Sequence, residues 1–245
     1  SGYEEAGCQG LLAGINAACY LHGRPPIVLT RAEAYTGVLI DDLVTIGTNE
    51  PYRMFTSRAE YRLCLRHDNA DIRLFEKGYA AGLNDEEKYE QFIQKKNGIE
   101  EIKELLRKRT LKQKELADNG ILSKHVGKSL AQILKDPQIT VDDFFQVEPT
   151  LFSYNREWLQ QSELDVKYEG YIKRQEQQVN RFHRMENVRI PQDFDFDEVE
   201  GLSRGAREKL KMINPSSVGQ ASRISGVRSS DIALLLVLLG RNRKR

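Results

Sequence analysis

The stretch NEPYRMFTSRAEYRLCLRH (Asn49–His67) contains four arginines and four aromatic rings, counting the imidazole of His67. Guanidinium groups bind phosphates with two hydrogen bonds and stack on flat rings, so arginine beside tyrosine is typical of surfaces that bind nucleic acid. Apolar residues of the same stretch would anchor it to a core: Met54, Phe55, Leu63 and Leu65. The sequence therefore predicts an arginine-rich segment fixed on a folded unit. The alternative is a strand or helix with a charged, solvated face.

Residues 4–20, which precede this stretch, are rich in alanine and glycine. Glycine inside a helix costs about 0.5–1 kcal/mol relative to alanine, so we expect a buried helix that packs closely against a sheet or another helix. Its free N–H groups and dipole would favour negative charge at the N-terminal end, although an ordinary packing helix is the alternative. Pro25 and Pro26 end this helix, and the runs that follow predict three short strands: Ile27–Leu29, Val38–Ile40 and Val44–Ile46.

The pattern changes at Asn84, beyond which apolar residues recur every three or four positions. This period predicts a helix beginning near Asp85 and helices in most of the remaining chain. A short helix at Leu130–Leu134 would end near Pro137, and another would start within Thr140–Phe145. Three short helices are expected to close the chain as a compact bundle: Gly205–Ile213, Ser217–Ile224 and Ser230–Leu239.

A longer helix is expected from Asp165 to Asn187. One face would pack inward, with Tyr168, Tyr171, Ile172, Gln175, Val179 and Phe182. The opposite face has two adjacent polar stripes, one with Lys167, Arg174 and Arg181 and the other with Lys173, Gln177, Asn180 and Arg184. Such stripes suit a phosphate backbone, and a solvated helix face is the alternative.

The composition excludes several classes of function. The chain of 245 residues is 40% hydrophobic and 30% charged, which predicts one or two cores and long solvated helices. Its three cysteines and four histidines have no metal-ligand spacing, so no metal site is expected. The longest apolar run, Ile232–Leu239, is far shorter than the roughly 20 residues of a membrane-spanning helix. No secretory signal is visible, and we expect a cytoplasmic protein.

The distribution of charge is uneven, although the net charge is only +1. Residues 201–245 contain ten Lys and Arg against two acids, a net charge of +8. Acidic segments precede them, one from Asp142 to Asp165 and one from Asp193 to Glu200. We expect the basic tail to meet nucleic acid or an acidic partner first.

No catalytic constellation is visible in the sequence. It has no GxGxxG fingerprint, no GxSxG elbow, no GxxxxGK[ST] phosphate loop and no paired metal ligands, so the catalytic residues are unknown. Cys64 alternates with Leu63 and Leu65, which indicates packing rather than reactivity.

The stretch EPYRMFTSRAEYRL closely resembles a signature of the MnmG/GidA family, the flavin-dependent enzymes that modify tRNA uridine. The resemblance continues from end to end in the order that the family shows: Gly2–Ala6, Gln9–Leu11, Gly14–Ala18, Arg31–Tyr35, Gly37–Val44, Asp68–Leu74, Tyr168–Ile172, Glu200–Ser203 and Ala221–Val227. The family's N-terminal part, with its first dinucleotide-binding glycines and redox cysteines, has no counterpart here. The chain is therefore expected to be a C-terminal fragment.

This resemblance implies a mainly α fold. A small α/β remnant of the flavin-binding domain would occupy residues 1–83 and a helical domain residues 84–200. The short three-helix bundle with its basic tail would occupy residues 201–245.

The resemblance also implies a function for the parent protein. With the MnmE GTPase, the family adds a carboxymethylaminomethyl or aminomethyl group to C5 of the wobble uridine of tRNA. It uses FAD that NADH reduces, and the parent is expected to be a homodimer. By this resemblance Gly2, Tyr3 and Glu4 would lie at the flavin. The residues expected to contact tRNA are Arg53, Arg58, Arg62, Arg66, Lys173, Arg174 and Arg181, and the terminal bundle would receive the GTPase or the tRNA.

Two other interpretations stay open. The chain could be a helical RNA- or protein-binding module without catalysis of its own, since this fragment alone is expected to be inactive. It could also be related to the folate-dependent tRNA uridine methyltransferase, which shares the flavin domain. The long helical extension fits the uridine modifiers better.

Overall fold

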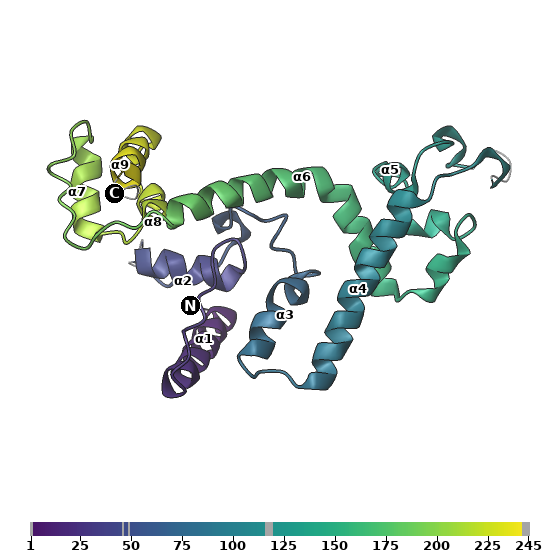
Figure 1. The fold of residues 1–245 in the computed structure, drawn as a ribbon, viewed down its shortest axis with the longest axis horizontal. Helices are drawn as coiled ribbons and strands as arrows, with labels where there is room; N and C mark the ends of the chain where they lie inside the picture. The colour runs from purple at the N-terminus through teal and green to yellow at the C-terminus, as the bar shows by residue number, and fades with distance from the viewer. Residues whose placement is uncertain (1, 46, 49, 116–119, 242–245) are drawn as a thin grey trace. The chain divides into compact units, whose positions relative to one another are not determined.

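The protein is almost entirely helical in the computed structural model, which describes residues 2–45, 47–48, 50–115 and 120–241 (Figure 1). The α-helices are α1 (Tyr3–Leu21), α2 (Tyr35–Thr45), α3 (Ala70–Ala80), α4 (Glu86–Lys108), α5 (Leu130–Ile133), α6 (Arg156–Glu186), α7 (Arg204–Ile213), α8 (Val218–Arg223) and α9 (Ser229–Arg241). Short 3-10 helices lie at Thr56–Arg58, Gln113–Glu115, Ser123–His125, Val141–Phe144 and Pro149–Ser153. Among these residues, β pairing is limited to the isolated bridges Thr110–Ser129 and Arg189–Ser217. The prediction of a mainly α protein is confirmed.

The chain folds into two compact units, and each combines segments that are distant in sequence. Unit 1 comprises Ser1–Gly14, Val28–Tyr61 and Arg174–Arg245, and unit 2 comprises Ile15–Ile27 and Arg62–Lys173. Each unit therefore draws on several of the three predicted domains, whose boundaries stay predictions.

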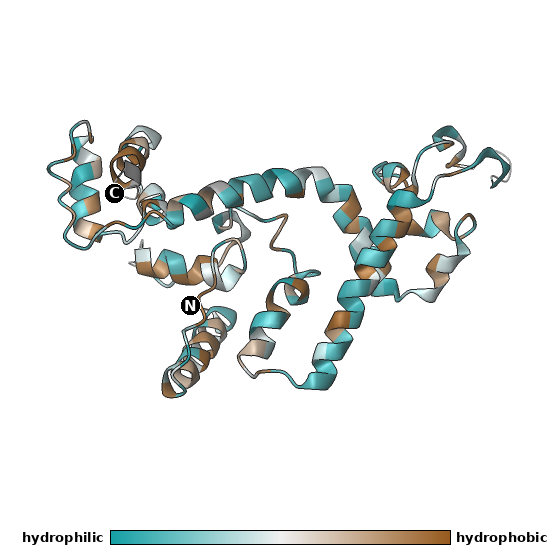
Figure 2. Cartoon of the chain, viewed as in Figure 1, coloured by the Kyte–Doolittle hydropathy of each residue, from teal (hydrophilic) through white to brown (hydrophobic). Residues whose placement is uncertain are grey.

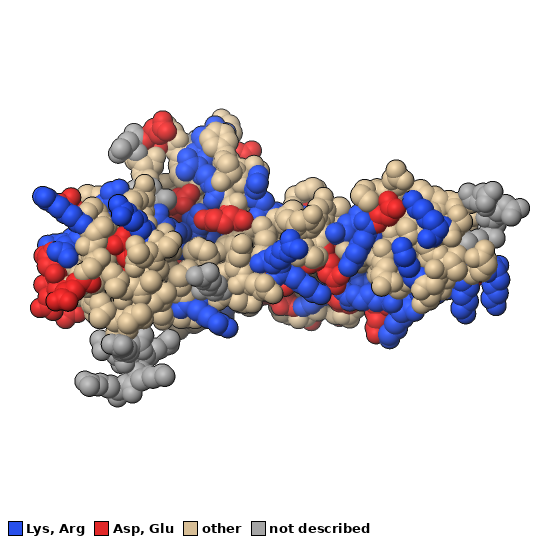
Figure 3. Space-filling view, turned by 90° about the horizontal axis from the view of Figure 1, so that it is seen from above, with Lys and Arg blue, Asp and Glu red and all other residues tan. Residues whose placement is uncertain are grey.

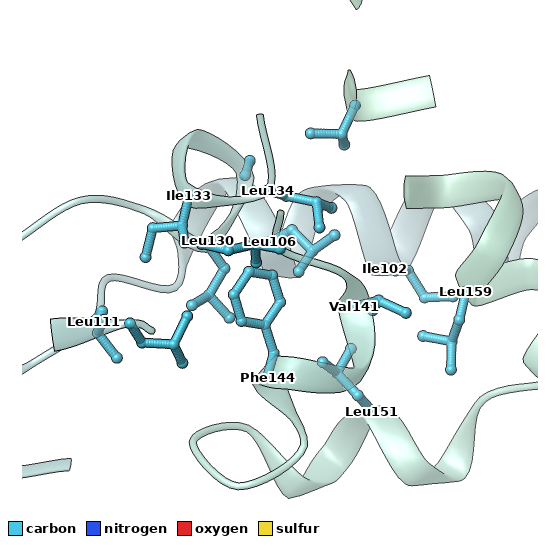
Figure 4. Packing of buried hydrophobic residues seen from close by; sticks show 14 residues of the cluster. Ile102, Leu106, Leu111, Leu130, Ile133, Leu134, Val141, Phe144, Leu151 and Leu159 are labelled. Carbon is cyan, nitrogen blue, oxygen red and sulfur yellow. The ribbon is translucent and has the colours of Figure 1, made fainter. Parts of the chain in front are cut away.

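The core of unit 2 forms where α4 and α5 meet the irregular chain that leads into α6. Phe144 is fully buried and points toward Leu106 and Leu130 (Figure 4). Side-chain hydrogen bonds at the N-caps mark the starts of α4 and α5 in this core. The side chain of Asp85 accepts a hydrogen bond from the N–H of Lys88, and Ser129 forms a capping box with Gln132. Other buried members are Ile102, Leu111, Ile133, Leu134, Ile139, Val141, Leu151 and Leu159.

Helices α7, α8 and α9 form the terminal bundle within unit 1, as predicted from their spacing. Ser203 and Ser217 cap α7 and α8 with side-chain oxygens. Asn214 ends α7 in the left-handed conformation, with φ of 49°, where asparagine is tolerated better than most residues. The bundle core contains Ile190, Phe196, Val199, Leu202, Ala206, Leu210, Val218, Ala221, Ile224, Ile232, Leu235 and Leu239.

The predicted strands at Val38–Ile40 and Val44–Ile46 are wrong, because α2 occupies this region; Ile46 lies outside the described residues. The buried positions of α2 have helical spacing: Gly37, Val38, Leu39, Asp42 and Thr45. Position 37 requires glycine, because a Cβ there would lie 2.2 Å from the carbonyl oxygen of Thr30. Ile27–Leu29 is likewise irregular chain rather than a strand.

Three further expectations are wrong in detail. Helix α1 forms as predicted but is mostly exposed, with Leu11 59% and Tyr20 85% accessible, although its residues are largely hydrophobic (Figure 2). Helix α6 begins nine residues earlier than expected, at Arg156 rather than Asp165. On α6 the side chains of Tyr168 and Tyr171 are exposed rather than packed inward.

Candidate nucleic-acid interface

A pair of carboxylates on α2, the buried Asp42 and the partly buried Asp41, organises the arginine-rich stretch. Arg31 donates from Nη1 to Asp42 at 2.5 Å and to Asp41 at 3.1 Å, and from Nη2 to Glu60 at 2.7 Å. Burial would lower the pKa of the Arg31 guanidinium, but hydrogen bonds to Glu60 and Asp42 outweigh it and raise that pKa. Arg31 is therefore a fixed cation that joins α2 to the stretch.

Tyr52 is the second residue that binds the carboxylates of α2. Its hydroxyl donates to Asp42 Oδ2 at 2.6 Å in a buried position. Burial and the neighbouring Asp42 raise the pKa of Tyr52, so the hydroxyl stays protonated. The ring is thereby held in one orientation.

Arg58 uses that ring as a platform. Its Cζ lies 4.5 Å from the centroid of the Tyr52 ring, and its Nε donates to the carbonyl oxygen of Arg53 at 3.0 Å. The nearest approach to Asp42 is 3.9 Å, and 41% of the Arg58 side chain is exposed. A stacked guanidinium with open edges can take a phosphate without reorganising.

Glu5 on α1 holds the beginning of the stretch. Its buried carboxylate accepts the N–H of Met54 at 2.9 Å and lies 3.5 Å from Nε of Arg53, whose side chain is 60% exposed. The hydrogen bond from Met54 is the main cause that lowers the pKa of Glu5. Arg53 and Arg58 are thus both fixed at their bases and open to solvent.

The remaining arginines of the stretch, Arg62 and Arg66, lie in unit 2 and differ from each other. Arg62 is exposed and forms no ion pair with any residue that the structure describes. Arg66 is nearly buried, with Nη2 at 2.9 Å from Asp68 and 2.6 Å from Asp165. Its guanidinium is occupied by carboxylates, which points to a structural role rather than contact with RNA.

A cavity of about 320 Å³ lies in unit 1 beside the carboxylate pair. Its lining includes Arg31, Asp41, Tyr61, Glu186 and Arg223. Arg223 on α8 donates from Nη2 to Asp41 at 2.8 Å and from Nη1 to Glu186 on α6. Burial raises the pKa of Tyr61 to about 12. The charged residues that line the cavity are largely paired with one another. We therefore interpret the cavity as part of the structure that supports the arginine-rich stretch.

The candidate cations of α6 are less constrained. The Lys173 side chain is 69% exposed and its Nζ lies 3.5 Å from Glu169, one turn earlier. Arg174 is exposed. The backbone of Arg181 lies in α6, but its side chain is outside the described residues.

The three residues predicted at a flavin lie at the start of α1. Tyr3 is 97% exposed, and Glu4 is exposed as well. A Cβ on Gly2 would meet Glu5 Oε2 at 2.2 Å and Arg53 Cζ at 3.3 Å. These atoms are the far ends of flexible side chains, so a larger residue at position 2 would displace Glu5 and Arg53. The exposed helix start beside Gly2 could form one edge of a cofactor site.

No group of three or more His, Cys, Asp or Glu side chains in the described part of the chain could hold a metal ion. None of the described helices combines the length and apolar character needed to cross a membrane.

Arg31, Asp41 and Asp42 were missed as organising residues by the sequence argument. The sequence predicted strands at Val38–Ile40 and Val44–Ile46, and it assigned no role to Asp41 and Asp42 between them. A helical reading places Asp42 on the same face as Val38, and a buried aspartate there requires a cation, which Arg31 supplies.

We expect Arg66→Met to lower the free energy of unfolding by about 3 kcal/mol at pH 7, because Asp68 and Asp165 would be left without their shared cation. In the wild type, burial opposes ionisation of Asp68, but the hydrogen bond from Arg66 lowers its pKa below the ordinary value of 3.8. The stability that this pair supplies is therefore present above 3.8 and is lost as the pH falls through the lowered pKa. Urea unfolding at pH 7 and pH 3 measures this, and an equal deficit at both pH values would contradict it.

Models of known protein families match most of the chain. The family model "tRNA modifying enzyme MnmG/GidA C-terminal helical domain" matches residues 86–176, and "tRNA modifying enzyme MnmG/GidA C-terminal helical bundle" matches residues 178–245. A third model, "Glucose inhibited division protein A", matches residues 1–25. The chain belongs to the MnmG/GidA family.

Individual members of the MnmG/GidA family agree with this assignment. The tRNA uridine 5-carboxymethylaminomethyl modification enzyme MnmG of Borreliella afzelii is 54% identical over 237 residues, which cover 97% of this chain and 38% of that protein. MnmG of Caldicellulosiruptor saccharolyticus is 48% identical over 249 residues, covering 100% of this chain and 40% of that protein. The crystal structure of Aquifex aeolicus GidA (form II) superposes with a TM-score of 0.79 at 41% identity, over 98% of this chain and 38% of that chain. The chain thus spans about two fifths of the length of its MnmG relatives.

Proposed function

We propose that this chain is the tRNA-binding and partner-docking part of an FAD-dependent enzyme that modifies tRNA. With the MnmE GTPase, the longer protein would add a carboxymethylaminomethyl or aminomethyl group to C5 of the wobble uridine. The names of the relatives support the reaction class. The chain would act in the cytoplasm, where the enzyme meets its tRNA, and as a homodimer.

The proposed tRNA contacts are the exposed cations. Arg53 and Arg58 have fixed bases and open guanidinium edges, and Arg58 is already stacked on Tyr52. Arg62 would bind a further phosphate, and the cations Lys173, Arg174 and Arg181 of α6 would do the same. We leave Arg66 out, because Asp68 and Asp165 occupy its guanidinium. The stacked, exposed Arg58 is the observation that carries the proposal.

The proposed cofactor role is confined to the start of α1. FAD, reduced by NADH, would supply electrons to the reaction. Gly2, Tyr3 and Glu4 would contribute one edge of its site, where helix N–H groups favour negative charge. The rest of that site and the catalytic residues would come from sequence outside this chain.

The proposed partner surface is the terminal bundle of α7, α8 and α9. Val237 and Leu238 on α9 and Met212 on α7 are exposed apolar residues of this bundle. The MnmE GTPase would dock there, and the flavin content of the longer protein would not depend on it.

We expect Arg58→Ala in the longer protein to weaken tRNA binding and to reduce the slope of log affinity against log salt by about one unit, because one phosphate contact is lost. Fluorescence anisotropy with a tRNA transcript at several salt concentrations measures this. Lys88→Ala on α4, where Lys88 pairs with Asp85, is the control that should change neither quantity. An unchanged slope for Arg58→Ala would remove Arg58 from the interface.

A further inference from the structure

A second concentration of positive charge lies in residues 103–135, outside both the arginine-rich stretch and the basic tail. This segment contains nine Lys and Arg against three Asp and Glu, a net charge of +6. It covers the C-terminal end of α4, the chain that follows, and α5, all within unit 2. Basic side chains gather over the part of the molecule that contains α4 and α5 (Figure 3).

Three helical regions direct their cations to one carboxylate there. Glu169 on α6 lies 2.9 Å from Nζ of Lys135, 3.5 Å from Nζ of Lys173 and 3.6 Å from Nη2 of Arg107. The hydrogen bond from Lys135 is the main cause that lowers the pKa of Glu169, so it is ionised at neutral pH. One negative charge cannot neutralise three positive ones, and this cluster keeps a net charge of +2.

The cations of the cluster remain accessible. The side chains of Arg107, Lys135 and Lys173 are 51%, 49% and 69% exposed, whereas Glu169 is only 28% exposed. An incoming anion therefore meets the cations before the carboxylate. Glu169 holds the three side chains close together, which lowers the entropy that they lose when they bind.

Four further cations of the segment fall into two groups. Lys103 and Arg109 are mostly buried in ion pairs with Asp165 and Glu148, and they serve the fold. Lys112 and Lys114 are exposed, and neither forms an ion pair with any residue within the described ranges. The dipole at the end of α4 explains cations in its last turn, but Lys112 and Lys114 lie beyond that helix.

We propose that Arg107, Lys112, Lys114, Lys135 and Lys173 form a second surface for the phosphate backbone of RNA, which rests on the proposed tRNA function and extends it to the segment 103–135. Lysine is depleted in protein interfaces, where aromatic and apolar residues are enriched. Large exposed apolar side chains of the described part of 103–135 are limited to Ile121 and Val126. A lysine-rich surface with so few apolar side chains fits a polyanion better than a protein partner.

The test compares variants of the longer protein by anisotropy with an unmodified tRNA transcript over a range of salt concentrations. The triple variant Lys112→Gln, Lys114→Gln, Lys135→Gln is expected to reduce the salt slope by about two units and to weaken binding at least tenfold at 0.15 M salt, because about three phosphate contacts are lost. The matched control is Lys88→Gln with Lys96→Gln, which neutralises exposed, ion-paired lysines in the first turn and the middle of α4. Lys88 and Lys96 are roughly 28 Å and 16 Å from Arg107 along that helix, beyond the range of screened charge, so the control should bind like the wild type.

A second variant tests the same surface by a gain rather than a loss. Glu169→Gln removes the central negative charge and frees three cations, so we expect severalfold tighter binding and a steeper salt slope. If the triple variant keeps its slope while Arg58→Ala loses one unit, the second surface is refuted and the proposed function stands. If neither variant changes the slope, both proposals fail. Weaker binding of the GTPase with unchanged binding of tRNA would also overturn this proposal.

Discussion

Arg31→Ala is expected to lower the free energy of unfolding by about 3–5 kcal/mol, since it breaks a nearly buried ion-pair cluster from one side only. Only 12% of the Arg31 side chain is exposed, and it faces Asp41, Asp42 and Glu60. Asp42 is 6% exposed and would keep only Tyr52 as a close hydrogen-bonding partner. Removing the cation leaves carboxylates that repel one another in a poorly solvated position.

The measurement is urea unfolding followed by circular dichroism. Arg31→Lys is the control that keeps the charge but not the planar fork, and we expect it to recover part of the loss. The loss should also appear in tRNA binding, because Arg31 donates to the carbonyl oxygen of Arg58 and so fixes the segment that carries this side chain. A loss below about 1 kcal/mol for Arg31→Ala would show that solvent reaches the cluster.

Phe144→Ala is expected to cost about 3–5 kcal/mol, which combines the lost transfer of the ring from water with the cavity that it leaves. Phe144 is fully buried among residues of α4, α5 and the chain before α6. These neighbours come from separate parts of unit 2, so the site has little freedom to collapse around a smaller side chain.

Phe152→Ala is the matched control for this prediction. Phe152 is 69% exposed and stacks on Phe145 at 4.2 Å between ring centroids. Its removal takes away one surface contact, and we expect a cost below about 1 kcal/mol. Urea unfolding of both variants decides the matter, and similar costs for the two would mean that the Phe144 site repacks.

The sequence predicted those elements whose signals are local. Asp85 and Ser129 cap α4 and α5, and Ser217 caps α8, and all three helices lie close to the predicted positions. The terminal bundle was predictable for the same reason. Local signals failed at α2, where β-branched and apolar residues favoured a strand but burial follows a helical period.

The candidate site was predictable only in part, because the function of an arginine depends on partners that are distant in sequence. Arg58 and Arg66 look alike within the stretch, but Arg58 lies over the ring of Tyr52, whereas Arg66 binds Asp165, 99 residues away. Similarly, Tyr171 has the helical position of an inward residue, but it is 58% exposed. Such differences arise from tertiary contacts that no short pattern encodes.

The separation between Asp41 and Arg223 has a consequence for synthesis of the protein. Asp41 emerges from the ribosome 182 residues before Arg223, which at 5–20 residues per second corresponds to roughly 10–40 s. Arg31 precedes Asp41 by only ten residues and is available from the start. The nascent chain can therefore neutralise Asp41 and Asp42 early with Arg31. The ion pair between Arg223 and Asp41, which joins α8 to α2, forms only after nearly all of these 245 residues have been translated.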